Sequence, residues 1–236
     1  MKERGMIFNG EMVRAILDGR KTQTRRIMKP QPGPCPRGGH WWPSNVFKTM
    51  LHVEEEMQNG KGGWGGLVGD ACPFGDVGDR IWVRETFTGH YLDDDQIQDI
   101  KDGRDKASSL CEYRADYPDG YQAADGWTPS IHMPRWASRI LLEITDVRVE
   151  QLNAISPEDA ESEGLERTNF TGFGDEPGLP SYPEPDVYFD PLKKQWKEYP
   201  PEAFAGLWES IYGEESWKAN PWVWVIEFKR VEGGAS

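Results

Sequence analysis

The sequence predicts an α+β fold: a small β-barrel with a few short helices, in a single domain spanning residues 1–236. Two observations support this class. Strongly β-forming runs recur along the whole length, the last of them at residues 221–231, "PWVWVIEFKRV". Helix-forming runs are few and short, and stretches rich in glycine and proline separate them. Such a pattern is typical of a small barrel decorated by long loops.

The chain is expected to begin with a strand at residues 6–8, followed by a helix. Asn9 is a suitable N-cap. Four apolar residues then recur at helical spacing and define one face of the helix: Met12, Val13, Ile16 and Leu17. Gly19 is expected to end this helix, so residues 20–26, "RKTQTRR", should leave it directly as extended chain.

Two further strands and two further helices follow. Residues 78–88 read as a turn and a strand that places Ile81, Val83 and Glu85 on one face. Residues 136–152 form a long strand, bent near Asp146. A short helix at 156–164 has Ser156 as its N-cap and Gly164 as its terminator. A helix at 201–213 has an apolar face that consists of Phe204, Leu207, Trp208 and Ile211.

Three segments are expected to be insertions into this core. Residues 30–76 and 167–200 are rich in glycine and proline, and residues 86–130 are mostly polar. These segments make up much of the difference between this chain and a compact barrel.

The charge distribution limits the class of partner. The formal net charge is −13, which disfavours a broad grip on duplex DNA. Residues 1–30 nevertheless carry eight basic and three acidic residues. A local basic patch on an acidic body suits a small polar or anionic ligand better than a long polyanion. No run is long and apolar enough to span a bilayer, and the N-terminus lacks a signal peptide, so we expect a cytoplasmic protein without a membrane partner.

Four segments together resemble the ASCH domain, a relative of the PUA-like barrels: "ILDGRKTQTRR", "GDRIWV", "LEITDVRVEQLNAISPEDAESEG" and "WVIEFKRV". The similarity is greatest to the small bacterial N4-acetylcytidine amidohydrolases. It covers about half the chain and leaves the three insertions without a counterpart. Longer ASCH proteins of this kind also occur in phage and prophage genomes.

The resemblance implies a catalytic set of lysine, threonine and glutamate. It places these roles on Lys21, Thr24 and Glu163. The family's turn ends in Thr-x-Arg, so its arginine corresponds by register to Arg26, and Arg25 replaces an apolar residue. Arg20, Thr22, Arg25 and Arg26 are therefore expected to bind substrate.

Elementary chemistry fits these roles. A threonine hydroxyl needs a neighbouring base, and Lys21 lies three residues before Thr24, within hydrogen-bond reach if the backbone curls. Burial and nearby arginines would lower the pKa of a lysine toward neutrality. Glu163 would protonate the leaving amine if an apolar pocket raises its pKa, although nearby arginines would shift it the other way. The alternative is a solvated helix exit with Glu163 as a surface carboxylate.

Other residues offer weaker candidates. Arg84 and Glu85 would contact the ligand if their strand lines the barrel mouth; the alternative is ordinary cross-strand pairing. Cys35, His40 and Cys72 could bind zinc, but the sequence holds no Cys-x-x-Cys pair. We therefore expect no metal and no cofactor.

Three functions remain open from the sequence. The first is an amidohydrolase that removes an N-acyl group from a modified cytosine nucleoside. The second is a non-catalytic ASCH module that binds RNA, such as a short single strand, or a modified nucleobase. The third is a ribonuclease, which ranks last because His40, His52, His90 and His132 all lie away from the motif in sequence.

Overall fold

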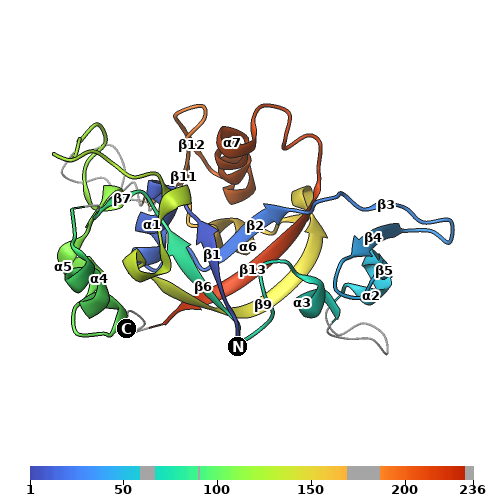
Figure 1. Ribbon diagram of the computed structural model, residues 1–236. Coiled ribbons are helices and arrows are strands. Elements are labelled where there is room, and N and C mark those ends of the chain that lie inside the picture. Colours follow the sequence, from blue (N-terminus) through green and yellow to red (C-terminus); the bar gives the residue numbers. More distant parts are fainter. Residues whose placement is uncertain (59–66, 90, 169–186, 232–236) are drawn as a thin grey trace, which may run out of the picture.

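The computed structural model describes residues 1–58, 67–89, 91–168 and 187–231, and it is an α+β structure built around one five-stranded sheet (Figure 1). The strand order of this sheet is β1-β6-β9-β13-β2. Its strands are β1 (Glu3–Ile7), β6 (Arg80–Arg84), β9 (Leu141–Gln151), β13 (Trp222–Arg230) and β2 (Gln23–Ile27). Only the β1–β6 pair is parallel. No pairing between β1 and β2 closes these described strands into a barrel, so a closed barrel stays a prediction.

The remaining elements surround this sheet. The helices are α1 (Gly10–Leu17), α2 (Val53–Glu56), α3 (Leu67–Ala71), α4 (Asp94–Lys101), α5 (Ala107–Leu110), α6 (Pro157–Ser162) and α7 (Pro200–Tyr212). Short 3-10 turns are η1 (Arg114–Asp116), η2 (Ser130–His132), η3 (Arg135–Ala137) and η4 (Leu152–Ala154). The small strands are β3 (Gly33–Pro34), β4 (His40–Ser44), β5 (Thr49–His52), β7 (Phe87–Thr88), β8 (Glu112–Tyr113), β10 (Arg167–Thr168), β11 (Val187–Asp190) and β12 (Gln195–Lys197).

Local signals in the sequence set most of the central elements. The Asn9 side chain accepts from the backbone of Met12 and caps α1, as predicted. Ser156 caps α6 in the same way. The predicted bend in the long strand is a β-bulge, because the partners of β13 jump from Asp146 to Ile144.

Some boundaries differ from the sequence prediction. The first strand is Glu3–Ile7 rather than 6–8. The long strand begins at Leu141 rather than at 136, because residues 135–137 form η3 and the Ser138 hydroxyl bonds to the Val83 carbonyl. Ile211 was predicted on the buried face of α7 but is 41% exposed.

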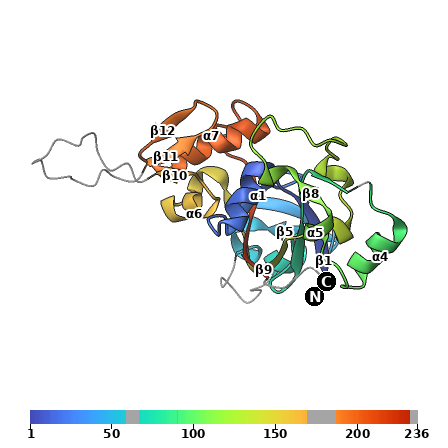
Figure 2. The same ribbon diagram turned by 90° about the vertical axis from the view of Figure 1, so that its left-hand side faces the viewer.

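The two faces of the central sheet carry separate apolar cores. On one face Val13 and Ile16 of α1 pack with Trp224 and Ile226 of β13. On the other face α7 packs onto Val223 and Val225 through Phe204, Leu207 and Trp208. Figure 2 shows α6, α7 and the β10–β11–β12 sheet on one side of the molecule and α4 on the other. Side chains alternate between the two faces along β13 and along its partner β2. Successive residues of β2 therefore face different cores.

The predicted insertions contain regular structure where they are described. Residues 30–76 hold the β3–β4–β5 sheet together with α2 and α3. Residues 86–130 hold α4, α5 and the β7–β8 pair, and they contribute to a third apolar core around Phe87 and Tyr113. Residues 187–197 form a hairpin that packs against α7. Most of the 167–200 segment lies outside the described residues.

Candidate functional site

Lys21 and Glu163 meet where the end of α6 lies beside the exit of α1. The backbones of these two residues form an isolated antiparallel bridge. Gly164 has a φ of +88°, and a Cβ there would lie 2.7 Å from the Cβ of Lys21. A glycine at this position therefore ends α6 and also allows the two segments to approach so closely.

The Lys21 ammonium is fully buried and bonds to Glu163 twice. Its Nζ donates to the Glu163 carboxylate Oε2 at 2.7 Å and to the Glu163 backbone carbonyl at 2.8 Å. The lysine side chain is 0% exposed and that of Glu163 is 3% exposed. Burial lowers the pKa of Lys21; Glu163 opposes that shift, and the neighbouring Arg26 and Arg25 add to it.

Arg25 is the second cation of this group. Its Nη1 donates to the Glu163 Oε1 at 3.1 Å, so the two oxygens of Glu163 accept from two different cations. The Arg25 side chain is 0% exposed. Lys21, Arg25 and Glu163 are called the site cluster below.

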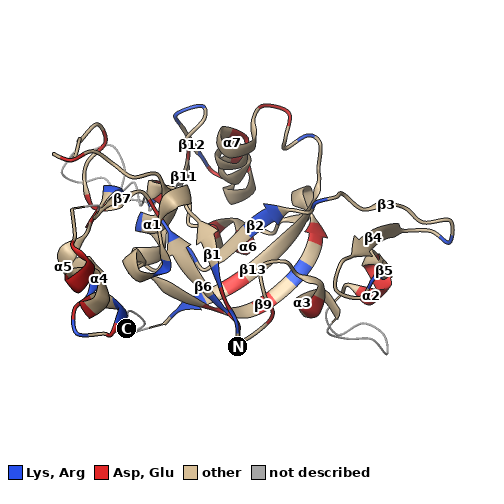
Figure 3. Cartoon of the chain, viewed as in Figure 1, with Lys and Arg blue, Asp and Glu red and all other residues tan. Residues whose placement is uncertain are grey.

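A charged network extends from Arg25 along the sheet. Arg25 also donates to Glu150 of β9 and to Asp159 of α6. Arg148 of β9 donates to Asp159 at 2.7 Å and contacts Glu227 of β13. Burial raises the pKa of Asp159, but a hydrogen bond from Gln23 and the positive charges of Arg148 and Arg25 hold it below its usual value. Figure 3 shows the basic residues of β2 beside charged segments of β13 and β9.

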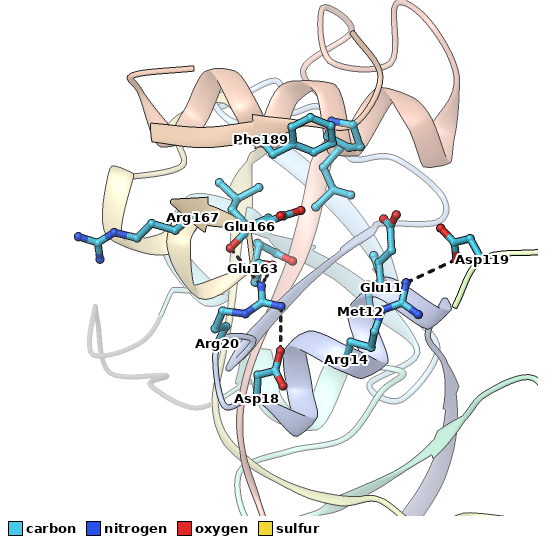
Figure 4. Close-up of a pocket in the computed structure, with 14 residues that line it drawn as sticks. Glu11, Met12, Arg14, Asp18, Arg20, Asp119, Glu163, Glu166, Arg167 and Phe189 are labelled. Atoms are coloured by element: carbon cyan, nitrogen blue, oxygen red, sulfur yellow. Dashed lines mark hydrogen bonds and ion pairs between the residues drawn. The ribbon is translucent and has the colours of Figure 1, made fainter. Parts of the chain in front are cut away.

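Two cavities reach the site cluster. The wide cavity has a volume of about 450 Å³ and lies between α1, the segment after α6 and the β11 strand (Figure 4). Glu163, Arg20, Phe189 and Leu207 are among its lining residues. The narrow cavity has a volume of about 20 Å³ and is lined by Thr24, Arg25, Arg26, Glu163 and residues of α7. Glu163 is a lining residue of both cavities.

The rim of the wide cavity carries both signs of charge. In Figure 4 the Arg20 guanidinium lies beside Asp18, whereas Arg167 points away from them. Arg20 donates to Asp18 at 3.1 Å and to the Gly164 carbonyl at 2.9 Å. Phe189 and Leu207 provide an apolar wall. Apolar walls with a few convergent polar groups are typical of small-molecule sites.

The structure assembles part of the predicted catalytic set. Lys21 and Glu163 are together, and Thr24 lies on the narrow cavity that Glu163 also borders. The two hydrogen bonds of the Lys21 ammonium go to Glu163 and not to Thr24. The nucleophile–base contact expected from the sequence spacing is therefore not formed in this conformation.

The predicted substrate-binding residues are scattered. Arg26 donates to the Ile7 carbonyl and lies over the Phe8 ring, on the sheet face opposite Arg25. Arg26 and Arg25 line the narrow cavity, and Arg20 lines the wide one. Thr22 is exposed and lines neither cavity. Arg25 is the arginine that contacts the Lys21–Glu163 pair, through Glu163. The resemblance had aligned Arg26 with this role.

Arg84 and Glu85 belong to another part of the molecule. Arg84 bonds to the Ile131 carbonyl and lies over the Trp82 ring. Both oxygens of Glu85 accept from Arg139, at 2.9 and 3.0 Å. Arg139 also forms two hydrogen bonds to Asp116. Glu85, Arg139 and Asp116 are called the clamp cluster below.

The other candidate groups do not converge on the site. Within the described residues no group of three histidine, cysteine or acidic side chains is arranged to hold a metal, so Cys35, His40 and Cys72 form no such cluster. His40, His52 and His132 line neither cavity that reaches Glu163, and His90 lies outside the described residues. None of the described helices is long and apolar enough to span a membrane.

Glu150, Asp159 and Arg148 belong to this network but are not among the site residues predicted from the sequence. Arg148 and Glu150 lie two residues apart on one strand, which places their side chains on the same sheet face. That spacing can be read from the sequence, but no local signal indicates that Arg25 faces these two residues.

No protein-family model, curated protein or solved structure matches the chain.

Proposed function

We propose that the protein is an amidohydrolase on a PUA-like (ASCH) fold that removes the N4-acyl group from a modified cytosine nucleoside such as N4-acetylcytidine. One observation carries this proposal: Lys21 forms a buried pair with Glu163, and Glu163 borders both an open cavity of about 450 Å³ and a narrow cavity lined by Thr24. A buried lysine with a lowered pKa can act as a base. The volume of the wide cavity falls within the range of small-molecule sites.

The reaction is assigned to this chain's residues as follows. The free amine of Lys21 takes the proton of the Thr24 hydroxyl as its oxygen attacks the acyl carbonyl. The resulting ammonium gives that proton to the departing N4 amine, which leaves as cytidine. Water then hydrolyses the acyl ester, releases the carboxylic acid and restores Thr24. Hydrogen bonds between nucleophile and base often form only once substrate binds.

Glu163 has a holding role in this scheme. The sequence-based expectation gave it the role of acid for the leaving amine. Because both its oxygens already accept from cations, we assign proton delivery to Lys21 instead. Glu163, which borders both cavities, then holds the Lys21 amine in place through its carboxylate Oε2.

The binding module is the less supported alternative. Arg20, Lys21, Arg25 and Arg26 each donate to acceptors of the chain itself, which leaves this turn poorly suited to gripping phosphates. Salt distinguishes the two functions. RNA binding through the turn would weaken steeply with ionic strength, whereas turnover of a neutral nucleoside would not.

An absorbance assay with N4-acetylcytidine tests the proposal. We expect turnover by the wild-type protein and a loss of about 10³-fold in Lys21→Ala. Lys229→Ala is the matched control, because Lys229 also pairs with a glutamate, Glu143, but is exposed and lines neither cavity. It should keep full activity. A folded wild-type protein without turnover would rule out this substrate and favour the binding module.

A further inference from the structure

Arg25 occupies an unusual position for an arginine. Its guanidinium is completely buried on β2 and contacts carboxylates from three places: Glu150 on β9, Asp159 on α6, and Glu163 just after α6. The guanidinium also lies 5.8 Å from the centroid of the Phe204 ring on α7. Because an arginine carries five donors in a rigid plane, it can hold several carboxylates in one fixed arrangement.

The two oxygens of the Glu163 carboxylate accept hydrogen bonds from different cations. Arg25 takes Oε1 at 3.1 Å, and Lys21 takes Oε2 at 2.7 Å. The carboxylate plane is thereby fixed from both sides. Without Arg25, the free oxygen would have no cation beside it, and the carboxylate could rotate toward Lys21 or toward the wide cavity.

We propose that Arg25 is a positioning residue: it holds Glu163 so that one carboxylate oxygen alone faces Lys21, and it thereby sets where the lysine amine lies. The inference rests on the proposed function, since it concerns the same site. Its first test needs no substrate, so the two can fail separately.

Arg148 provides a matched control within the same network. It is an arginine on β9, which is separated from β2 by β13, and it shares Asp159 and Glu150 with Arg25. Its ion pairs do not include Glu163 or Lys21. Loss of either arginine should destabilise the network, but only loss of Arg25 should alter the site cluster.

The first measurement is the titration of the Lys21 side chain by NMR, with its signal assigned by its loss in Lys21→Ala. Arg25→Met should raise the pKa of Lys21, because Glu163 becomes free to pair with the lysine alone and the smaller of two cationic influences is removed, while that of Arg26 remains. Arg148→Met should leave the Lys21 titration where it is in the wild-type protein. Equal Lys21 titrations in Arg25→Met, Arg148→Met and the wild type would overturn the inference.

The second measurement is the turnover of N4-acetylcytidine by the same variants. Arg25→Met should lower kcat by about 10²-fold, the scale of a misplaced catalytic group, with KM changed less than about twofold. Arg25→Lys keeps a cation but cannot hold three carboxylates, so its kcat should fall by about tenfold. It is the variant to assay if Arg25→Met does not fold, and a wild-type kcat in Arg25→Lys would contradict the inference.

The two proposals are separable by these outcomes. If the wild-type protein does not turn over N4-acetylcytidine but Arg25→Met moves the Lys21 titration, Arg25 still positions the pair and only the reaction is wrong. If turnover occurs but neither the titration nor kcat distinguishes Arg25→Met from Arg148→Met, the reaction stands and Arg25 is structural.

Discussion

In the site cluster the carboxylate of Glu163 divides its oxygens between two cations, whereas in the clamp cluster both oxygens of Glu85 accept from the single guanidinium of Arg139. Both carboxylates are almost completely buried, at 3% and 2% exposure. They differ in their surroundings. Glu163 borders two cavities, and neither of these is lined by Glu85 or Arg139.

The clamp cluster has the geometry of a structural connection. Arg139 bridges Glu85, just after β6, to Asp116 in η1, and its guanidinium lies 3.9 Å from the centroid of the Tyr113 ring. The two parallel hydrogen bonds from Arg139 to Glu85 hold the end of β6 against the loops that follow it. Burial of a carboxylate–cation pair is therefore not by itself a sign of chemistry. Two features distinguish the site cluster: Glu163 borders a cavity, and its carboxylate is shared between two cations.

The largest expected effect on stability comes from breaking the clamp cluster. Glu85→Ala leaves the buried Arg139 with Asp116 as its remaining carboxylate partner, beside the Tyr113 ring. We expect a loss of about 3 kcal/mol in the free energy of unfolding, the lower end for breaking a buried ion pair, because Asp116 remains. Urea denaturation measures this loss, and the turnover per folded molecule should stay near the wild-type value. A loss below about 1 kcal/mol would contradict the structural role.

A smaller loss of stability is expected from the site cluster. Lys21→Met removes the cost of burying an ammonium, and Glu163 keeps Arg25 as its partner. The free energy of unfolding should therefore fall by about 1 kcal/mol or less, measured in the same denaturation series. If Lys21→Met proved as destabilising as Glu85→Ala, the two clusters would not differ in the way proposed.

The smallest effect is a difference in how stability depends on pH. Burial lowers the pKa of Lys21 from 10.5, so between that lowered value and 10.5 the unfolded chain holds a proton that the folded chain has released. The free energy of unfolding should rise with pH in that window, and Lys21→Met should lack this rise.

The opposite slope is expected for the clamp cluster at acidic pH. Burial raises the pKa of Glu85 above 4.5, against the lowering effect of Arg139. Between 4.5 and the raised value the folded chain holds the extra proton, so its free energy of unfolding should fall as pH rises. Comparing Glu85→Ala with the wild-type protein across this window isolates that contribution. Equal slopes in the two proteins would contradict it.

The sequence determined the local structure around the site. The cap at Asn9, the end of α1 near Gly19, the cap at Ser156 and the final strand all depend on residues close in the chain, so local propensity was sufficient to place them. Strand alternation also determined that Arg25 and Arg26 must face opposite sides of β2.

Only the tertiary structure decided which of these two arginines joins the site. That choice depends on which sheet face α6 and α7 cover, and therefore on packing between distant segments. Lys21 and Glu163 are 142 residues apart, and their contact requires both the bridge between their backbones and the glycine that follows Glu163. The same applies to Glu85, whose partner Arg139 lies 54 residues away. Side-chain type and strand parity are local properties, whereas the neighbour across a packed interface is set by the whole fold.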